Sequence, residues 1–267
     1  MNNRTHPTSP PPVDPSSRPA PPQAVPSQPV PLRVTIPRSR PVVTWILLGI
    51  NILVWLEMTA LGGSTDPDVL IFFGAKYNPL IVRGEVWRLI TPLFLHIGLL
   101  HLASNMYAIY IIAPQVESFF GQARFLCIYL FSGIFGVLLS FMLSSGLSAG
   151  ASGAIFGLIG TRAAFFFRYR DAFGQRGQRQ FYNTLSVIAI NLIMTFTVSG
   201  IDIWGHIGGL LAGIVLGWYT MPRYKAVMTD QGPKLIDQRT FKEWGIAALL
   251  TALLLAAGTW AAILLKS

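Results

Sequence analysis

A serine among small residues stands at the head of an apolar stretch, in the sequence Gly150-Ala151-Ser152-Gly153. Its small neighbours allow another backbone or a substrate to approach the hydroxyl closely. A helix that begins at this serine has unpaired backbone N–H groups in its first turn, and these groups can stabilise an oxyanion. Small residues also pack membrane helices together, so the motif alone does not establish catalysis. A nucleophilic Ser152 requires a base from elsewhere in the chain.

The chain contains four histidines, and three of them lie in apolar stretches. His6 belongs to a proline-rich segment, which leaves His96, His101 and His206 as candidate bases. Asn105 follows His101 by four residues, so the two side chains share one face of a helix. Histidine and asparagine are costly inside a membrane and indicate a functional site there.

Two stretches of small residues can bring His206 to Ser152. Close packing of two such helices would place the imidazole beside the serine, with Phe156 one turn below Ser152 and able to stack on the ring. The small residues around His206 are Gly205, Gly208, Gly209, Ala212 and Gly213, and those after Ser152 are Gly153, Gly157 and Gly160.

The composition is that of a polytopic membrane protein. Apolar residues make up 52% of the 267 residues and charged residues only 12%, whereas a soluble domain has roughly 25% charged residues. The net charge of +9 comes from basic residues between the apolar stretches. This distribution is typical of membrane orientation and argues against nucleic acid as a partner. The single Cys127 excludes an intrachain disulfide.

Residues 1–41 hold thirteen of the nineteen prolines and are expected to be a disordered cytoplasmic tail. We expect a six-helix core over residues 42–220, a basic cytoplasmic loop over 221–243, and a seventh helix over 244–267. No apolar core of a signal peptide precedes residue 42. The expected spans are 42–60, 89–113 with Pro114 as its stop, 125–145, a short fourth that starts at Ser152 and has Arg162 at its inner end, 184–199, 205–219 and 244–265.

The positive-inside rule then places the N-terminus in the cytoplasm and the C-terminus outside. The fourth span reaches charge at Arg162, and ten residues of helix rise only about 15 Å. It can reach the cytoplasmic loop only by starting within the membrane, which sets Ser152 below the outer surface. His96, His101, Asn105 and His206 come to a similar depth.

These motifs, in this order and spacing, resemble the rhomboid family of intramembrane serine proteases. The resemblance covers about residues 42–220 and rests on Gly150–Gly153, the Gly-His-Ile-Gly-Gly sequence around His206, and the set of His96, His101 and Asn105. Trp87-Arg88 is similar to the family's Trp-Arg pair in the first loop, and Glu117 with Gly121 is similar to its acidic-glycine turn. The seventh helix suggests the six-plus-one form.

The resemblance implies a role for each residue. Ser152 would be the nucleophile and His206 the general base and acid of a dyad, with neither metal nor cofactor. The Ser152 N–H, His101 and Asn105 would form the oxyanion hole, and His96 would support it by hydrogen bonding. Gly150 and Gly153 would support the site as the small neighbours of the serine, Phe156 would stack on His206, and Trp87 and Arg88 would shape the outer loop. Many family members have tyrosine at the Phe156 position, so a hydroxyl hydrogen bond is missing here.

Several alternatives compete with this interpretation. Asp202, four residues before His206, could complete a triad, but a cap of the sixth helix is the simpler function for it. A metal site is disfavoured because His96 and His101 are five residues apart and no H-E-x-x-H helix exists. A silent rhomboid-like protein that binds transmembrane helices without cutting them would normally lack the serine or the histidine. A transporter would show repeats or interrupted helices.

The expected substrates are single-span membrane proteins whose helix unwinds near small or helix-breaking residues. Access would need movement of an outer loop or of the fifth helix. The compact six-plus-one layout, with no transit peptide, favours a bacterial plasma membrane.

Overall fold

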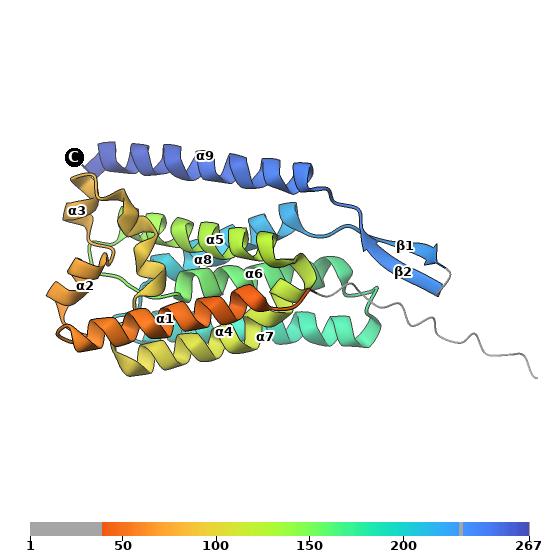
Figure 1. Ribbon diagram of the computed structural model, residues 1–267, viewed down its shortest axis with the longest axis horizontal. Coiled ribbons are helices and arrows are strands. Elements are labelled where there is room, and N and C mark those ends of the chain that lie inside the picture. Colours follow the sequence, from red (N-terminus) through yellow and green to blue (C-terminus); the bar gives the residue numbers. More distant parts are fainter. Residues whose placement is uncertain (1–38, 230–231, 267) are drawn as a thin grey trace, which may run out of the picture. The chain divides into compact units, whose positions relative to one another are not determined.

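The computed structural model describes residues 39–229 and 232–266, and most of the expected 1–41 tail lies outside these ranges. The described chain is an all-α bundle with one small hairpin (Figure 1), which confirms the predicted fold class. The seven long helices are α1 Val42–Ala60, α4 Gly98–Phe120, α5 Gln122–Leu143, α6 Ser152–Tyr169, α7 Gly174–Thr197, α8 Ile203–Thr220 and α9 Phe241–Lys266.

Four helices of the described chain are long and apolar enough to cross a membrane, namely α1, α5, α8 and α9. The other three long helices carry polar residues that lower their hydropathy. In α4 these include His101 and Asn105, and the first turns of α7 are rich in glutamine and arginine. The polytopic class is therefore clear, whereas the count of seven spans stays a prediction.

The bounds expected for the second span, 89–113, are wrong at both ends. Two short 3-10 turns, η2 Val86–Leu89 and η3 Thr91–Phe94, occupy its expected start, and α4 begins only at Gly98. Pro114 lies inside α4 and does not stop it. The helix ends at Gly121, whose positive φ of 81° is a conformation open to glycine.

Three other segments contain more regular structure than the expected spans and loops describe. Helix α7 begins at Gly174, before the expected fifth span of 184–199, and its first turns are polar. The basic loop contains an antiparallel hairpin, β1 Tyr224–Thr229 with β2 Gly232–Asp237. The segment between α1 and α4 also contains two short helices, α2 Pro67–Phe73 and α3 Asn78–Val82.

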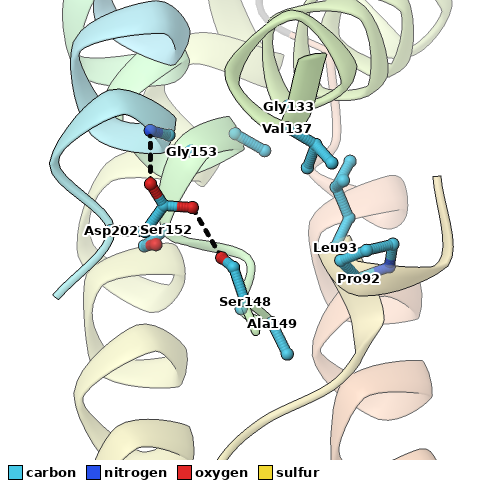
Figure 2. A pocket seen from close by; sticks show the side chains of 12 residues that line it. Pro92, Leu93, Gly133, Val137, Ser148, Ala149, Ser152, Gly153 and Asp202 are labelled. Carbon is cyan, nitrogen blue, oxygen red and sulfur yellow. Dashed lines mark hydrogen bonds between the residues drawn. The ribbon is translucent and has the colours of Figure 1, made fainter. Parts of the chain in front are cut away.

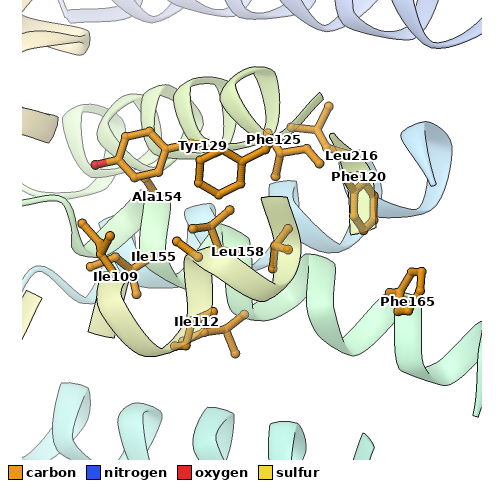
Figure 3. Packing of buried hydrophobic residues seen from close by; sticks show 14 of the residues in the cluster. Ile109, Ile112, Phe120, Phe125, Tyr129, Ala154, Ile155, Leu158, Phe165 and Leu216 are labelled. Carbon is orange, nitrogen blue, oxygen red and sulfur yellow. The ribbon is translucent and has the colours of Figure 1, made fainter. Parts of the chain in front are cut away.

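Helix α6 is the centre of the bundle, and most of its side chains between Ala154 and Phe166 are buried. Aliphatic and aromatic residues of α4 and α5 pack against it (Figure 3), including Ile109, Phe125 and Tyr129. Close packing of such side chains, through many small van der Waals attractions, stabilises the interior of a helical bundle.

Glycine forms the crossing of α6 and α8. A Cβ added at Gly209 would lie 2.0 Å from the Gly153 carbonyl oxygen, and one at Gly213 would lie 2.0 Å from the Gly157 carbonyl oxygen. One turn further, Gly217 lies against Thr161. The two backbones are therefore in direct contact over three turns, as the small-residue stretches predicted.

Two buried polar side chains, those of Glu117 and Lys76, hold other segments of the bundle in place. The Glu117 carboxylate on α4 accepts hydrogen bonds from the backbone N–H groups of Val43 and Thr44, both at 2.8 Å, and so caps the start of α1. The Lys76 ammonium is fully buried and donates to the carbonyl oxygens of Ser144 and Gly146. That contact ties the segment before α3 to the segment before α6.

Candidate active site

Ser152 is the first residue of α6. Its own N–H therefore has no acceptor one turn earlier in the helix. The segment before it is held by a hydrogen bond of 2.8 Å from the Gly150 N–H to the Pro92 carbonyl oxygen. Gly150 has a φ of 142°, a conformation that other residues rarely adopt. The serine therefore sits at a helix start with a donor directed out of the helix.

His206 lies in the first turn of α8 and is buried. Its ring stacks on Phe156 with the centroids 4.3 Å apart and the planes 20° apart, as the sequence predicted. Its Nδ1 lies 2.8 Å from the hydroxyl of Thr195 on α7. Two neighbours thus fix the imidazole, one on its face and one on its edge.

The crossing of α6 and α8 brings Ser152 and His206 together. The position of a Gly153 side chain would lie 3.2 Å from the carbonyl oxygen of Gly205, the residue before His206. Phe156, which holds the imidazole, is one turn from Ser152. Within the described chain no hydrogen bond joins the serine hydroxyl to His206, and such bonds are often long before substrate binds.

His101 and Ser152 both border the space that a side chain at position 150 would occupy. A Cβ at position 150 would lie 2.8 Å from His101 Nε2 and 3.6 Å from Ser152 Oγ. Any residue other than glycine would fill the space between them. His101 Nδ1 accepts a long hydrogen bond of 3.4 Å from the Ile97 N–H, so the ring proton of the neutral histidine lies on Nε2. The nitrogen that borders Gly150, Nε2, is therefore a donor.

Asn105 and His96 both contact His101. The Asn105 amide is buried and donates one N–H to the His101 carbonyl oxygen at 3.0 Å, which leaves its second N–H available. His96 is fully buried, and its ring meets that of His101 edge to face at 5.2 Å. His96 Nε2 accepts from the Ala151 N–H at 3.5 Å and so supports the segment before Ser152.

Trp87 and Arg88 lie away from these residues, in the turn η2. The Trp87 ring is about half exposed, whereas Arg88 is buried. The guanidinium binds the Glu85 carboxylate and donates to the carbonyl oxygens of Ile71 and Ala75. Arg88 therefore organises the first loop and takes no direct part at Ser152.

Asp202 caps α8, and Figure 2 shows both of its contacts. One carboxylate oxygen accepts from the Gly205 N–H at 2.9 Å and the other accepts from the Ser148 hydroxyl at 2.6 Å. The nitrogen that a triad carboxylate would bind, His206 Nδ1, meets Thr195 instead. The helix cap expected for Asp202 is present.

A small cavity of about 20 Å³ lies beside Ser152 (Figure 2), large enough for about one water molecule. Its lining comes from the serine segment, η3, α5 and the start of α8. Ser152, Ser148 and Asp202 supply its polar groups, and Gly153, Gly133 and Leu93 are among its other walls.

Thr195 and Ser148 are not identifiable from the sequence. Both are hydroxyl residues without a distinctive motif, and each contacts a residue of another segment, 11 and 54 positions further along the chain. No cluster of three His, Cys, Asp or Glu side chains that could hold a metal occurs in the described ranges.

Comparison with known proteins gives the family. The rhomboid domain matches residues 83–223 of the chain. The chain is 44% identical over 175 residues to rhomboid protease GluP of Bacillus subtilis, covering 66% of this chain and 34% of GluP. It is 34% identical to the putative rhomboid protease YdcA of the same organism, over 69% of this chain and 90% of YdcA. Rhomboid-like protease 1 of Toxoplasma gondii is 31% identical over 80% of this chain and 69% of the relative.

The matched domain contains both Ser152 and His206 and the glycine crossing between them. The chain spans about a third of GluP but nearly all of YdcA. With its apolar helices, it is an integral multi-pass membrane protein. The chain belongs to the rhomboid family.

Proposed function

We propose that this protein is an intramembrane serine endopeptidase in which Ser152 is the nucleophile and His206 is the general base. One observation carries the proposal: the His206 imidazole stacks on Phe156, one turn from Ser152, across a crossing of two glycine backbones. That contact holds a base beside a serine at a helix start, the arrangement that acyl transfer needs.

In the proposed reaction His206 takes the proton of the Ser152 hydroxyl while Oγ attacks the carbonyl carbon of the scissile peptide. The oxyanion that forms accepts hydrogen bonds from the Ser152 N–H, from His101 Nε2–H and from the free N–H of Asn105. The carbon–nitrogen bond then breaks, and the imidazolium gives its proton to the leaving amine. An acyl-enzyme on Ser152 remains.

Water completes the cycle. His206 removes a proton from a water molecule that attacks the ester, and the proton returns to Ser152 Oγ as the acyl group leaves. The cavity beside Ser152 has room for one such molecule between the serine and the polar side chains of Ser148 and Asp202. No metal or cofactor takes part in these steps.

The proposed substrates are single-span membrane proteins cleaved in or beside the transmembrane segment, where a locally unwound helix exposes its carbonyl groups. We assign the N-terminus to the cytoplasm and the C-terminus to the outside, on the positive-inside rule. A bacterial plasma membrane agrees with the origin of GluP and YdcA.

The alternative function is binding of client transmembrane helices without cleavage. The same crossing and outer loop would hold a helix, but that function needs neither a buried imidazole stacked near a serine nor a donor nitrogen of His101 facing it. Those two features favour the protease.

The test is cleavage of a tagged single-span substrate in liposomes by the unmodified protein, Ser152→Ala and His206→Ala. Ser145→Ala, in the exposed segment before α6, is the matched serine control. Loss of cleavage in the first two variants only, at equal thermal stability, is expected. Cleavage that survives Ser152→Ala would refute the nucleophile. Retention of substrate by an inactive unmodified protein would favour the helix-binding alternative.

A further inference from the structure

Thr195 on α7 contacts the Nδ1 edge of the His206 imidazole. A nucleophilic serine needs the opposite edge, which carries Nε2. Thr195 Oγ1 lies 2.8 Å from His206 Nδ1 and also donates to the Asn191 carbonyl oxygen at 2.7 Å. The threonine is 2% exposed. Water is therefore excluded as a competitor for either bond.

Counting protons decides the direction of these bonds. A hydroxyl has one proton and a carbonyl oxygen can only accept, so the Thr195 proton points to the Asn191 oxygen. The same hydroxyl must then accept from His206, which requires a proton on Nδ1. Neutral His206 is thereby held as the Nδ1–H tautomer, and the lone pair of Nε2 is left free.

The free lone pair is what a general base requires. In the Ser-His-Asp triad a carboxylate on Nδ1–H holds this tautomer and orients the ring. Here the carboxylate of Asp202 is engaged by Gly205 and Ser148, and a neutral hydroxyl occupies the position at Nδ1.

We propose that Thr195 is a positioning residue that keeps His206 in the Nδ1–H tautomer and directs Nε2 to Ser152. The inference rests on the proposed function for its catalytic consequence, but the tautomer itself does not. The inference gives α7 a role at the active site. Only three residues of that helix are buried, Gly177, Thr184 and Thr195, and Thr195, near its C-terminal end, contacts His206.

Three substitutions separate the hydroxyl from the shape of the side chain. Thr195→Val keeps the branched shape and removes both hydrogen bonds, whereas Thr195→Ser keeps the hydroxyl. Thr197→Val is the matched control, because Thr197 is exposed on the same helix and bonds only to backbone carbonyl oxygens of its own helix.

Steady-state cleavage of the single-span substrate in liposomes gives the first measurement. Loss of a hydrogen bond that sets the tautomer is expected to lower kcat roughly 10-fold or more in Thr195→Val. KM should stay within about twofold, since Thr195 does not touch substrate. Thr195→Ser should restore kcat to within about threefold, and Thr197→Val should match the unmodified protein.

The second measurement is independent of cleavage. In ¹⁵N-histidine-labelled protein, the His206 resonances, assigned by their absence in His206→Ala, report which ring nitrogen carries the proton. An Nδ1–H tautomer in the unmodified protein, shifting toward Nε2–H in Thr195→Val, is expected. An Nε2–H tautomer in the unmodified protein would overturn the inference, as would an unchanged kcat in folded Thr195→Val.

The two proposals fail differently. Cleavage that persists in Ser152→Ala refutes the protease mechanism and leaves the tautomer measurement intact. Full activity in Thr195→Val with no activity in Ser152→Ala refutes only the role of Thr195.

Discussion

Replacing Gly213 with alanine tests the crossing of α6 and α8. The added Cβ would lie 2.0 Å from the Gly157 carbonyl oxygen and 2.4 Å from its Cα. Both atoms belong to the backbone, so no side-chain rotation can relieve the overlap. To restore an ordinary contact of 3.4 Å, the two helices must separate by about 1.4 Å.

The separation has an estimable cost. Overpacking of a well-packed interior destabilises a protein by about 1–3 kcal/mol, and more when the backbone must move. The higher helix propensity of alanine returns at most about 1 kcal/mol. We therefore expect Gly213→Ala to lower the free energy of unfolding by roughly 2–3 kcal/mol. Cleavage should fall as well, since the displacement moves His206 relative to Ser152.

Gly49→Ala is the matched control. Gly49 lies in α1, and an added Cβ would meet nothing within 4 Å. The free energy of unfolding of both variants can be measured by denaturant titration in mixed micelles. If Gly213→Ala proves as stable as Gly49→Ala, the helices are not in the close contact described here and the reasoning fails.

Three further changes have defined outcomes. Glu117→Gln replaces an acceptor oxygen by an amide donor at the start of α1, where Thr44 donates, and should lower the free energy of unfolding by roughly 2 kcal/mol. Phe156→Leu removes the ring stacked on His206, a contact typically worth about 0.5–1.5 kcal/mol, and should lower kcat roughly 2- to 10-fold. Burial lowers the pKa of Lys76 from 10.5 to about 8, so between these values the unfolded chain binds more protons than the folded one. The free energy of unfolding of the unmodified protein should therefore rise with pH across that window relative to Lys76→Met.

Controls for these changes come from exposed positions of the same residue types. They are Glu57→Gln, Phe135→Leu and Lys225→Met. Equal effects of Glu117→Gln and Glu57→Gln on unfolding would contradict the capping role. A kcat of Phe156→Leu equal to that of Phe135→Leu would show that stacking does not position the base. Parallel pH profiles of unfolding for the unmodified protein and Lys76→Met would exclude a buried titrating ammonium.

The sequence predicted what depends on residue type and spacing. Small residues at four-residue intervals determine that α6 and α8 can touch, and that contact brings Phe156 to His206. Asp202 was recognisable as a cap because its position before a helix and its short acceptor side chain are sufficient for the function.

Other features depend on information that hydropathy does not contain. The 3-10 turns before Gly98 are as apolar as the helix that follows, so a hydropathy window cannot separate them. The contact of Thr195 with His206 depends on how α7 is rotated relative to α8, and a single threonine gives no sign of that rotation.

The glycine crossing has a consequence for the register of the two helices. Gly153 meets Gly209, Gly157 meets Gly213 and Thr161 meets Gly217, so every pair has the same offset in sequence. A slide of α8 by four residues along α6, a translation of about 6 Å, would again set small residues against small residues. Close packing alone therefore does not determine which turn of α8 lies beside Ser152.

Contacts at the ends must select one register from this repeating series. The hydrogen bond between Ser148 and Asp202 joins residues that each stand four positions before Ser152 and His206. This bond forms in only one register of the two helices, because a slide of one turn would break it. The glycine residues permit the close approach of α6 and α8. The Ser148–Asp202 hydrogen bond, which lies outside the crossing, sets the register, and the distance between Ser152 and His206 depends on that register.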